Sequence, residues 1–343
     1  MKTLHAFLCW GAALLPGVLS AQVRETPAIL ALTEGGNPQG FVQGANDQGI
    51  LFATASGGQA QLVPYSKIRG EEFDKLIRFE ERTEQLGGPR ALFAAGQYHE
   101  AAEAFGKVAR DYAILLGAPK NFASEALFYQ MESLKRAGQY AVLAPLVNSP
   151  PAATIATKLP DAYKRPFEFH KLWALYGQSD WAGLKTALAV YQEPVTGDAK
   201  LLKSPNFTEL PPNELAQISF LRAKVYESEG AKDNALEDYY RSFTLAYGND
   251  ILLSKLAMGA AMLIQKGDPK VAAQNEAALH QMQSIAYFYG RRFGKDSMPA
   301  EFQAFAVKPV LPQLAPPPAT GDQAEGAAKP AEEPKPEEKE KKE

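Results

Sequence analysis

Cysteine is almost absent from this sequence. The single cysteine among 343 residues is Cys9, which lies inside an apolar run of residues 6–19. One cysteine cannot form an internal disulfide, and a chain that begins after residue 21 has no thiol that could act as a nucleophile. We therefore expect domains that are held together by packing alone.

Catalytic and metal-binding motifs are also missing. Beyond residue 21 the histidines are His99, His170 and His280, which stand far apart and in no metal-ligand spacing. The sequence has neither a Gly-x-Ser-x-Gly elbow nor a Gly-x-x-x-x-Gly-Lys phosphate loop. We therefore predict a protein that is not an enzyme and that uses no cofactor and no metal.

Neither sign of charge is in large excess, because the formal net charge is −3. Basic and aromatic side chains do not form a stripe, so we expect no nucleic-acid partner. After residue 21 no apolar segment is long enough to cross a bilayer. We therefore expect no integral membrane span once the N-terminal segment has been removed.

The first 21 residues have the pattern of a secretory signal peptide. Lys2 precedes the apolar run, and Ser20 and Ala21 place small residues at its end. We predict that residues 1–21 are cleaved and that the protein is exported to the periplasm or is associated with the cell envelope. A retained N-terminal membrane anchor is the alternative.

Residues 22–70 have the pattern of a small antiparallel β module. Short apolar runs alternate with turns rich in glycine, asparagine and aspartate, as in a meander of hairpins. The runs are residues 28–32, 40–44, 50–54 and 61–65. We predict an SH3-like or Sm-like module that packs on the next domain, either as a cap for the helices or as a binding module of its own.

A helical domain is expected over residues 71–307. Its period begins after Glu71, where Phe73, Leu76 and Ile77 are spaced by three and four. Between amphipathic segments a glycine recurs, at Gly96, Gly138, Gly177, Gly230 and Gly267. A glycine with positive φ ends one helix and allows the next to begin, so the sequence predicts a repeated helical hairpin.

These phrases resemble the tetratricopeptide repeat family. The best match lies at residues 216–249, with Leu221, Ala223, Tyr226, Gly230, Ala235 and Tyr239, and the phrase at residues 94–105 matches the turn and second helix. Met131 and His170 depart from the small residue of the pattern, and residues 193–212 form an insertion. Over residues 72–293 the resemblance implies a mainly α protein, an α-solenoid of stacked hairpins.

The resemblance also implies a binding site, because first helices of this family line a concave groove that binds peptides or partner proteins. Carried over to this sequence, the groove residues are Phe128, Glu132, Lys135, Arg136, Phe167, Lys171, Phe220, Lys224 and Glu227. Aromatic side chains beside lysine and arginine suit an extended peptide or a partner that carries carboxylates. The alternative for the phenylalanines is a place in the core between hairpins.

Residues 308–343 are rich in proline, alanine, glutamate and lysine, and this composition predicts a disordered tail.

Together these features favour a non-enzymatic binding scaffold with unknown protein or peptide partners in the cell envelope. Two alternatives stay open: a structural subunit of an envelope assembly, and a polysaccharide-binding protein or hydrolase partner. The cluster that suggests sugar binding is Tyr287, Phe288, Tyr289, Arg291 and Arg292.

Overall fold

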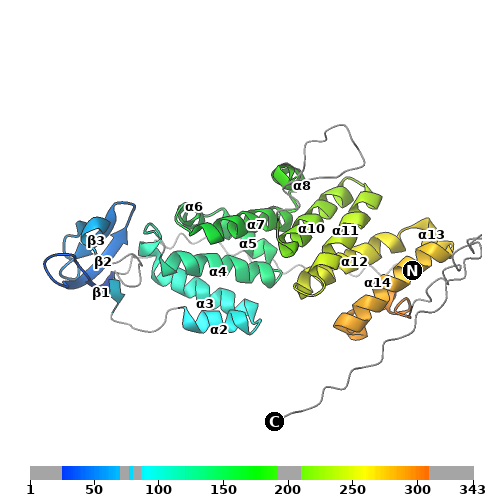
Figure 1. The fold of residues 1–343 in the computed structure, drawn as a ribbon, viewed down its shortest axis with the longest axis horizontal. Coiled ribbons are helices and arrows are strands. Elements are labelled where there is room, and N and C mark those ends of the chain that lie inside the picture. The colour runs from blue at the N-terminus through cyan, green and yellow to red at the C-terminus, as the bar shows by residue number, and fades with distance from the viewer. Residues whose placement is uncertain (1–24, 70–76, 80–85, 120, 192–209, 309–343) are drawn as a thin grey trace, which may run out of the picture.

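The computed structural model describes residues 25–69, 77–79, 86–119, 121–191 and 210–308. The protein is mainly helical, with a small antiparallel sheet at the N-terminal end of an elongated row of helices (Figure 1). The predicted signal peptide and nearly all of the predicted tail lie outside the described residues, as does most of the predicted insertion at 193–212. None of the described helices combines the length and the apolar composition that a membrane span requires.

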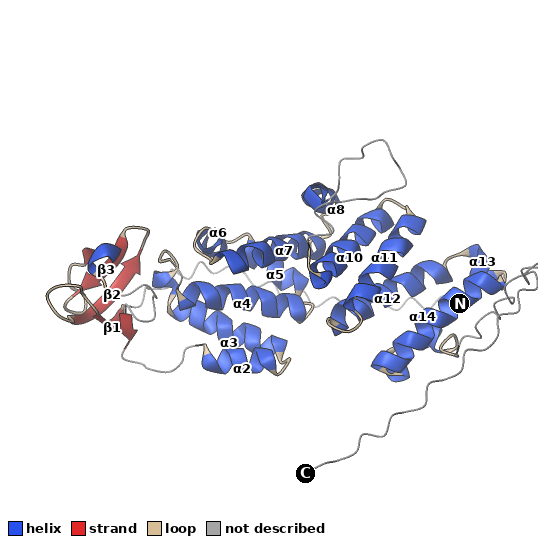
Figure 2. Ribbon diagram, viewed as in Figure 1, coloured by secondary structure: helices blue, strands red, loops and turns tan. Residues whose placement is uncertain are grey.

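The sheet has five strands in the order β4-β3-β2-β1-β5, and every neighbouring pair is antiparallel. Figure 2 shows the strands in red, apart from the helices. The strands are β1 (Thr26–Leu30), β2 (Gln39–Ala45), β3 (Gly49–Ala53), β4 (Gln61–Pro64) and β5 (Ile77–Phe79). A 3₁₀ turn, η1 (Tyr65–Lys67), follows β4. The four predicted strands are thus confirmed to within a few residues.

Strand β5 was not expected, because the spacing around Ile77 predicted a helix, and for Ile77 this prediction was wrong. Ile77 pairs with Leu30 and Phe79 pairs with Ala28, so β5 extends the sheet beyond the boundary predicted at residue 70. The physical reason is that β1 has an open edge of backbone donors and acceptors, and a returning strand satisfies them.

The sheet packs against the first helices through η2 (Ala113–Leu115). A Cβ atom built on Gly117 would lie 2.2 Å from the carbonyl oxygen of Ala45, so only a glycine permits this close approach. An ion pair between Lys158 and Asp47 adds a second link. The sheet therefore has a defined contact with the helical row.

The helices follow one another along the row and mostly contact the next in sequence. The longer ones are α3 (Tyr98–Asp111), α4 (Phe122–Arg136), α7 (Asp161–Gly177), α10 (Pro212–Ser228), α11 (Lys232–Ala246), α12 (Ile251–Lys266) and α14 (Glu276–Phe293). The shorter ones are α2 (Gly87–Ala94), α5 (Tyr140–Val147), α6 (Pro150–Ala156), α8 (Trp181–Leu188), α13 (Pro269–Ala272) and α15 (Ala300–Gln303), with 3₁₀ turns η3 (Ala189–Tyr191) and η4 (Lys295–Ser297).

Three of the five predicted turn glycines have the expected conformation. Gly96, Gly138 and Gly230 have φ values of 76°, 71° and 76° and separate α2 from α3, α4 from α5 and α10 from α11. The prediction was wrong for Gly177 and Gly267. After α7 the positive φ belongs to Ser179, at 56°, and Gly267 has φ −80°.

Gly177 has a packing role in place of a conformational one. A Cβ atom at this position would lie 2.5 Å from the carbonyl oxygen of Tyr140, so the end of α7 approaches the start of α5 more closely than any side chain allows. Stacked aromatic rings continue this contact through the core. The ring of Trp173 lies 4.7 Å from that of Tyr140 and 5.6 Å from that of Phe220.

Candidate functional site

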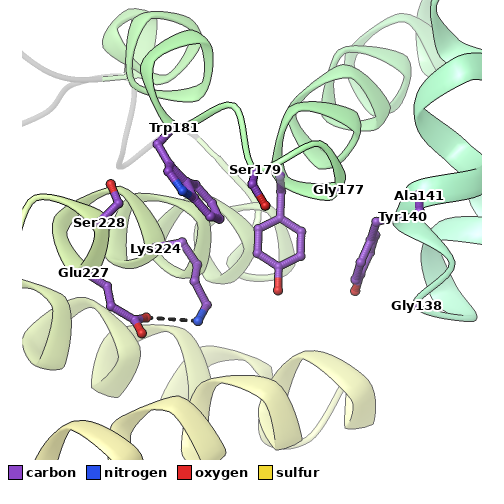
Figure 3. Close-up of a pocket in the computed structure, with 10 residues that line it drawn as sticks. Gly138, Tyr140, Ala141, Gly177, Ser179, Trp181, Lys224, Glu227 and Ser228 are labelled. Carbon is purple, nitrogen blue, oxygen red and sulfur yellow. Dashed lines mark hydrogen bonds and ion pairs between the residues drawn. The ribbon is translucent and has the colours of Figure 1, made fainter. Parts of the chain in front are cut away.

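Two adjoining hollows lie along the helical row and share Tyr140 as a wall. The first has a volume of about 550 Å³ and lies between the α4–α5 turn, the α7–α8 turn and α10 (Figure 3). The second, of about 460 Å³, lies between the α2–α3 turn, the end of α4, the helices α7 and α10 and the start of α12. We call the two hollows together the groove.

Helices α4, α7, α10 and α12 bring side chains from distant parts of the sequence to the groove. Figure 3 shows Trp181, Lys224 and Glu227 on one side of the first hollow, and Gly138 and Tyr140 on the other. The second hollow is lined by aromatic, amide and charged residues, among them Tyr98, Arg136, Trp173, Gln217, Asp250 and Lys255. The groove thus combines aromatic walls with groups that form hydrogen bonds and ion pairs.

Lys224 and Glu227 form an ion pair of 2.9 Å on one face of α10. Lys224 also lies over the rings of Phe220 and Tyr239, at 5.9 and 5.5 Å from their centroids. Tyr239 donates a hydrogen bond to Glu227. Burial alone would raise the pKa of Glu227, but the hydrogen bonds from Tyr239 and Lys224 outweigh it and lower the pKa. Glu227 is therefore a fixed negative charge in the first hollow.

Glu132 holds the cations of α4 from beneath the groove. Its carboxylate pairs with Lys135 at 2.7 Å and with Arg136 at 2.8 Å, and it accepts a hydrogen bond of 2.9 Å from Nε2 of His170 on α7. Burial would raise the pKa of Glu132, but Lys135, His170 and Arg136 together hold it well below its ordinary value. Glu132 thus stays ionised and fixes two cations at the edge of the second hollow.

His170 is completely buried between Phe128 and Phe167. Burial lowers its pKa, although the hydrogen bond to Glu132 and the charge of Glu132 act in the opposite direction. Nδ1 of His170 has no hydrogen-bond partner among the described residues. A proton on Nδ1 would therefore find no acceptor there, which agrees with a neutral imidazole.

Tyr140 and Gln217 supply polar groups in the centre of the groove. Burial, with smaller effects of Tyr176 and Asp250, raises the pKa of Tyr140 well above its usual value, so its hydroxyl stays protonated. Gln217 accepts a hydrogen bond of 2.8 Å from the indole nitrogen of Trp173. The indole is thus fixed at the floor of the second hollow.

Four of the nine predicted groove residues line the groove, namely Lys135, Arg136, Lys224 and Glu227. Glu132 lies beneath it, and Lys171 is exposed on α7, where it pairs with Glu168. Phe128, Phe167 and Phe220 are only 4%, 2% and 1% exposed. These three phenylalanines belong to the core, the alternative that the sequence left open, and they offer no surface to a partner.

Sequence reasoning missed the aromatic walls Tyr98, Tyr140, Trp173, Tyr176 and Trp181, and also Asp250 and Lys255. A signal for two of them was present. Tyr98 and Tyr140 both follow a Gly-Gln pair, at the start of the second helix of a hairpin. The turn thus places an aromatic ring at the groove edge, whereas the resemblance directed attention to first helices alone.

The proposed sugar-binding cluster is divided by the fold. Tyr289 is 6% exposed and its hydroxyl donates to the carbonyl oxygen of Ser297, whereas Phe288 and the two arginines lie on the surface.

Within the described ranges, no three histidine, cysteine, aspartate or glutamate residues are grouped so as to hold a metal ion. Comparisons with protein-family models, with curated proteins and with solved structures found no match to this chain.

Proposed function

We propose that this protein is an exported, non-enzymatic scaffold that binds an extended segment of a partner protein in its groove. The observation that carries the proposal is the shared wall at Tyr140, which joins two hollows lined by α4, α7, α10 and α12. Such a surface presents aromatic contact area and paired charges along a line, which suits an extended chain better than a compact ligand.

The groove offers apolar contacts to the hydrophobic side chains of a peptide and charged contacts to its polar groups. The rings of Tyr140 and Trp181 provide apolar contact area with little loss of conformational entropy. Arg136 uses its Nε to pair with Glu132, and 47% of its side chain is exposed for further contacts. A peptide with apolar side chains between polar ones would satisfy both kinds of wall.

The proposal includes the tetratricopeptide-like interpretation of the helices. Support comes from the positive φ of Gly96, Gly138 and Gly230 between paired helices, and from the first helices that line the groove. The strand order β4-β3-β2-β1-β5 is the support for an SH3-like or Sm-like module. Export and a location in the cell envelope rest on the signal-like pattern of residues 1–21.

Selection of peptides by the full chain tests this function. Peptides from a random displayed library would be selected on the immobilised protein, and their affinities for variants measured by calorimetry. We expect Tyr140→Ala and Lys224→Gln to weaken binding about tenfold each, because they remove a ring and a charge from the groove. Lys232→Gln is the matched control, since Lys232 is exposed at the start of α11.

Peptides that bind the groove variants and the control equally would place the binding site elsewhere and contradict the proposal. The isolated variants must also keep the unfolding temperature of the parent protein. Tyr140 stacks on Trp173, so Tyr140→Phe is a useful second variant that keeps the ring and removes the hydroxyl.

A structural subunit of an envelope assembly is the second candidate, and exposed apolar side chains favour it. Val142 on α5 and Leu263 on α12 are both more than half exposed. Contact with other subunits would cover them. Light scattering separates the two candidates, because a scaffold for transient partners is a monomer in solution and an assembly subunit has a higher mass.

A further inference from the structure

A third hollow lies at the C-terminal end of the helical row, apart from the groove. Its volume is about 430 Å³, and α14 forms one wall while residues 306–308 form another. Gly290 and Ala306 are among its lining residues, and a Cβ atom built on Gly290 would lie 3.2 Å from Cγ of Lys295. Backbone and small residues thus leave room for a ligand.

Three cationic residues from separate segments line this hollow. Arg291 comes from the last turn of α14, Lys295 from η4 and Lys308 from the segment after α15. None of the three has an ion-pair partner within the described part of the chain, and no carboxylate lines the hollow. Glu301 is near in sequence but pairs with Lys266. Positive charge is therefore concentrated here in a chain whose net charge is −3.

A basic last turn alone would be explained by the helix dipole, which stabilises cations near a helix C-terminus. That explanation covers Arg291. It does not cover Lys295 and Lys308, because they reach the same hollow from segments beyond the end of α14. Three like charges in one place repel each other unless an anion joins them.

We propose that this hollow is a binding site for a phosphate group. A phosphate ester carries a charge of about −1.5 to −2 and three acceptor oxygens, which matches three cationic donors better than a single carboxylate does. Arg291 presents a planar fork of donors, while Lys295 and Lys308 present point charges. Tyr287 also lines the hollow, and Val307, which is 48% exposed, adds an apolar surface for the organic part of the ligand.

Titration of the full chain with inorganic phosphate, followed by calorimetry at low ionic strength, tests the site. We expect saturable binding that is weakened about tenfold by Arg291→Gln and by Lys295→Gln, because each removes one charge-assisted contact. Lys232→Gln removes an equal charge from a distant surface of α11 and serves as the control. Absence of binding, or equal binding by the control and the two variants, would overturn the proposal.

A second arm distinguishes the sources of the phosphate. The protein would be sedimented with phosphatidylcholine vesicles that contain or lack phosphatidic acid. Retention only by phosphatidic acid, lost in Arg291→Gln, identifies a lipid headgroup as the source. Binding of inorganic phosphate without vesicle retention identifies a soluble phosphate ester, and retention that is unchanged in Arg291→Gln contradicts the assigned site.

Discussion

Among single residues, the buried Glu132 links three side chains beside the groove. It lies in α4, fixes Lys135 and Arg136 on its own helix and accepts a hydrogen bond from His170 on α7. Arg136 in turn lies over the rings of Phe93 and Tyr98. One buried carboxylate therefore positions a groove cation and joins two hairpins at the same time.

Loss of the Glu132 charge should destabilise the folded protein. We expect Glu132→Gln to lower the free energy of unfolding by about 3 kcal/mol, because it leaves Lys135 and Arg136 without their buried partner. Urea denaturation measures the change. Glu237→Gln is the matched control: Glu237 is 66% exposed and pairs with Arg241, so the expected change is about 0.5 kcal/mol or less. Equal losses in both variants would contradict the role of Glu132.

His170 predicts a pH dependence with a definite sign. Its pKa in the folded protein is below the usual 6.5, so between these two values the unfolded chain binds more protons than the folded one. The stability that neutral His170 contributes is therefore fully present above pH 6.5 and is lost as the pH falls toward the folded pKa. Urea denaturation at several pH values at least one unit above 4.5, the ordinary pKa of Glu132, should show this loss, because there Glu132 is largely ionised even in the unfolded chain.

His170→Gln is the comparison for that measurement. A glutamine side chain retains an N–H donor for Glu132 and does not titrate, so the variant should lose less stability than the parent on the same decrease in pH. Identical slopes for the two proteins would show that other groups cause the pH dependence.

At the scale of elements, the contact of α5 with α7 depends on a missing side chain. Gly177→Ala would place a methyl group 2.5 Å from the carbonyl oxygen of Tyr140 and force the helices apart. We expect a loss of about 1–3 kcal/mol in the free energy of unfolding, as for other overpacked sites. The measurement is again urea denaturation.

Gly259→Ala is the same substitution at another position, and there we expect a gain in stability instead of a loss. Gly259 lies inside α12, and a Cβ atom there would meet nothing within 4 Å. Alanine is the better helix former, so this variant should gain about 0.5–1 kcal/mol. No loss at Gly177 would show that helix propensity outweighs the close contact, and a loss at Gly259 would contradict the gain expected from helix propensity.

The same elements show what the sequence predicts and what it cannot. Strands β1 to β4 follow alternating runs between turn residues, and these local signals are sufficient. Strand β5 has three residues and a partner almost 50 positions away, so its pairing depends on the open edge of β1 rather than on its own pattern. Helical turns at Gly96, Gly138 and Gly230 could be predicted because positive φ favours glycine.

In the candidate site, too, some residues could be predicted from the sequence and others depend on tertiary contacts. Lys135 and Arg136 on α4 and Lys224 and Glu227 on α10 could be found because the resemblance to the tetratricopeptide repeat family implies that first helices line a groove. Phe220 could not be assigned to groove or core, because that choice depends on Trp173 and Tyr239 from neighbouring helices. Lys255 and Asp250 reach the groove only through the position of α12, which no local pattern encodes.

At the scale of the whole molecule, the sheet is fixed to the helical row at Gly117. Gly117→Ala would bring a Cβ atom to within 2.2 Å of the carbonyl oxygen of Ala45 and separate β2 from η2. We expect faster amide hydrogen exchange in β1 to β4, with unchanged exchange in α10 to α14. Mass spectrometry of peptic fragments measures both regions in one experiment.

Gly248→Ala is the control for this experiment, because a Cβ atom at Gly248 meets nothing within 4 Å. It should leave exchange in the sheet unchanged. If Gly117→Ala also leaves the sheet unchanged, the link between Lys158 and Asp47 is sufficient to hold it. Faster exchange throughout the chain would instead indicate global destabilisation.

A Cβ atom built on Gly138 would lie 3.8 Å from Cδ2 of Leu252 at the start of α12, so the α4–α5 turn lies near a helix more than 100 residues further along the chain. If each helix contacted only its neighbours in the row, tension would separate the helices one pair at a time. The end of α4, the start of α5 and the start of α12 line the second hollow together, so the middle of the row is also connected across this hollow. When the protein is pulled from its ends, we expect little extension until α12 separates from the end of α4, and then release of the intervening helices in one large step.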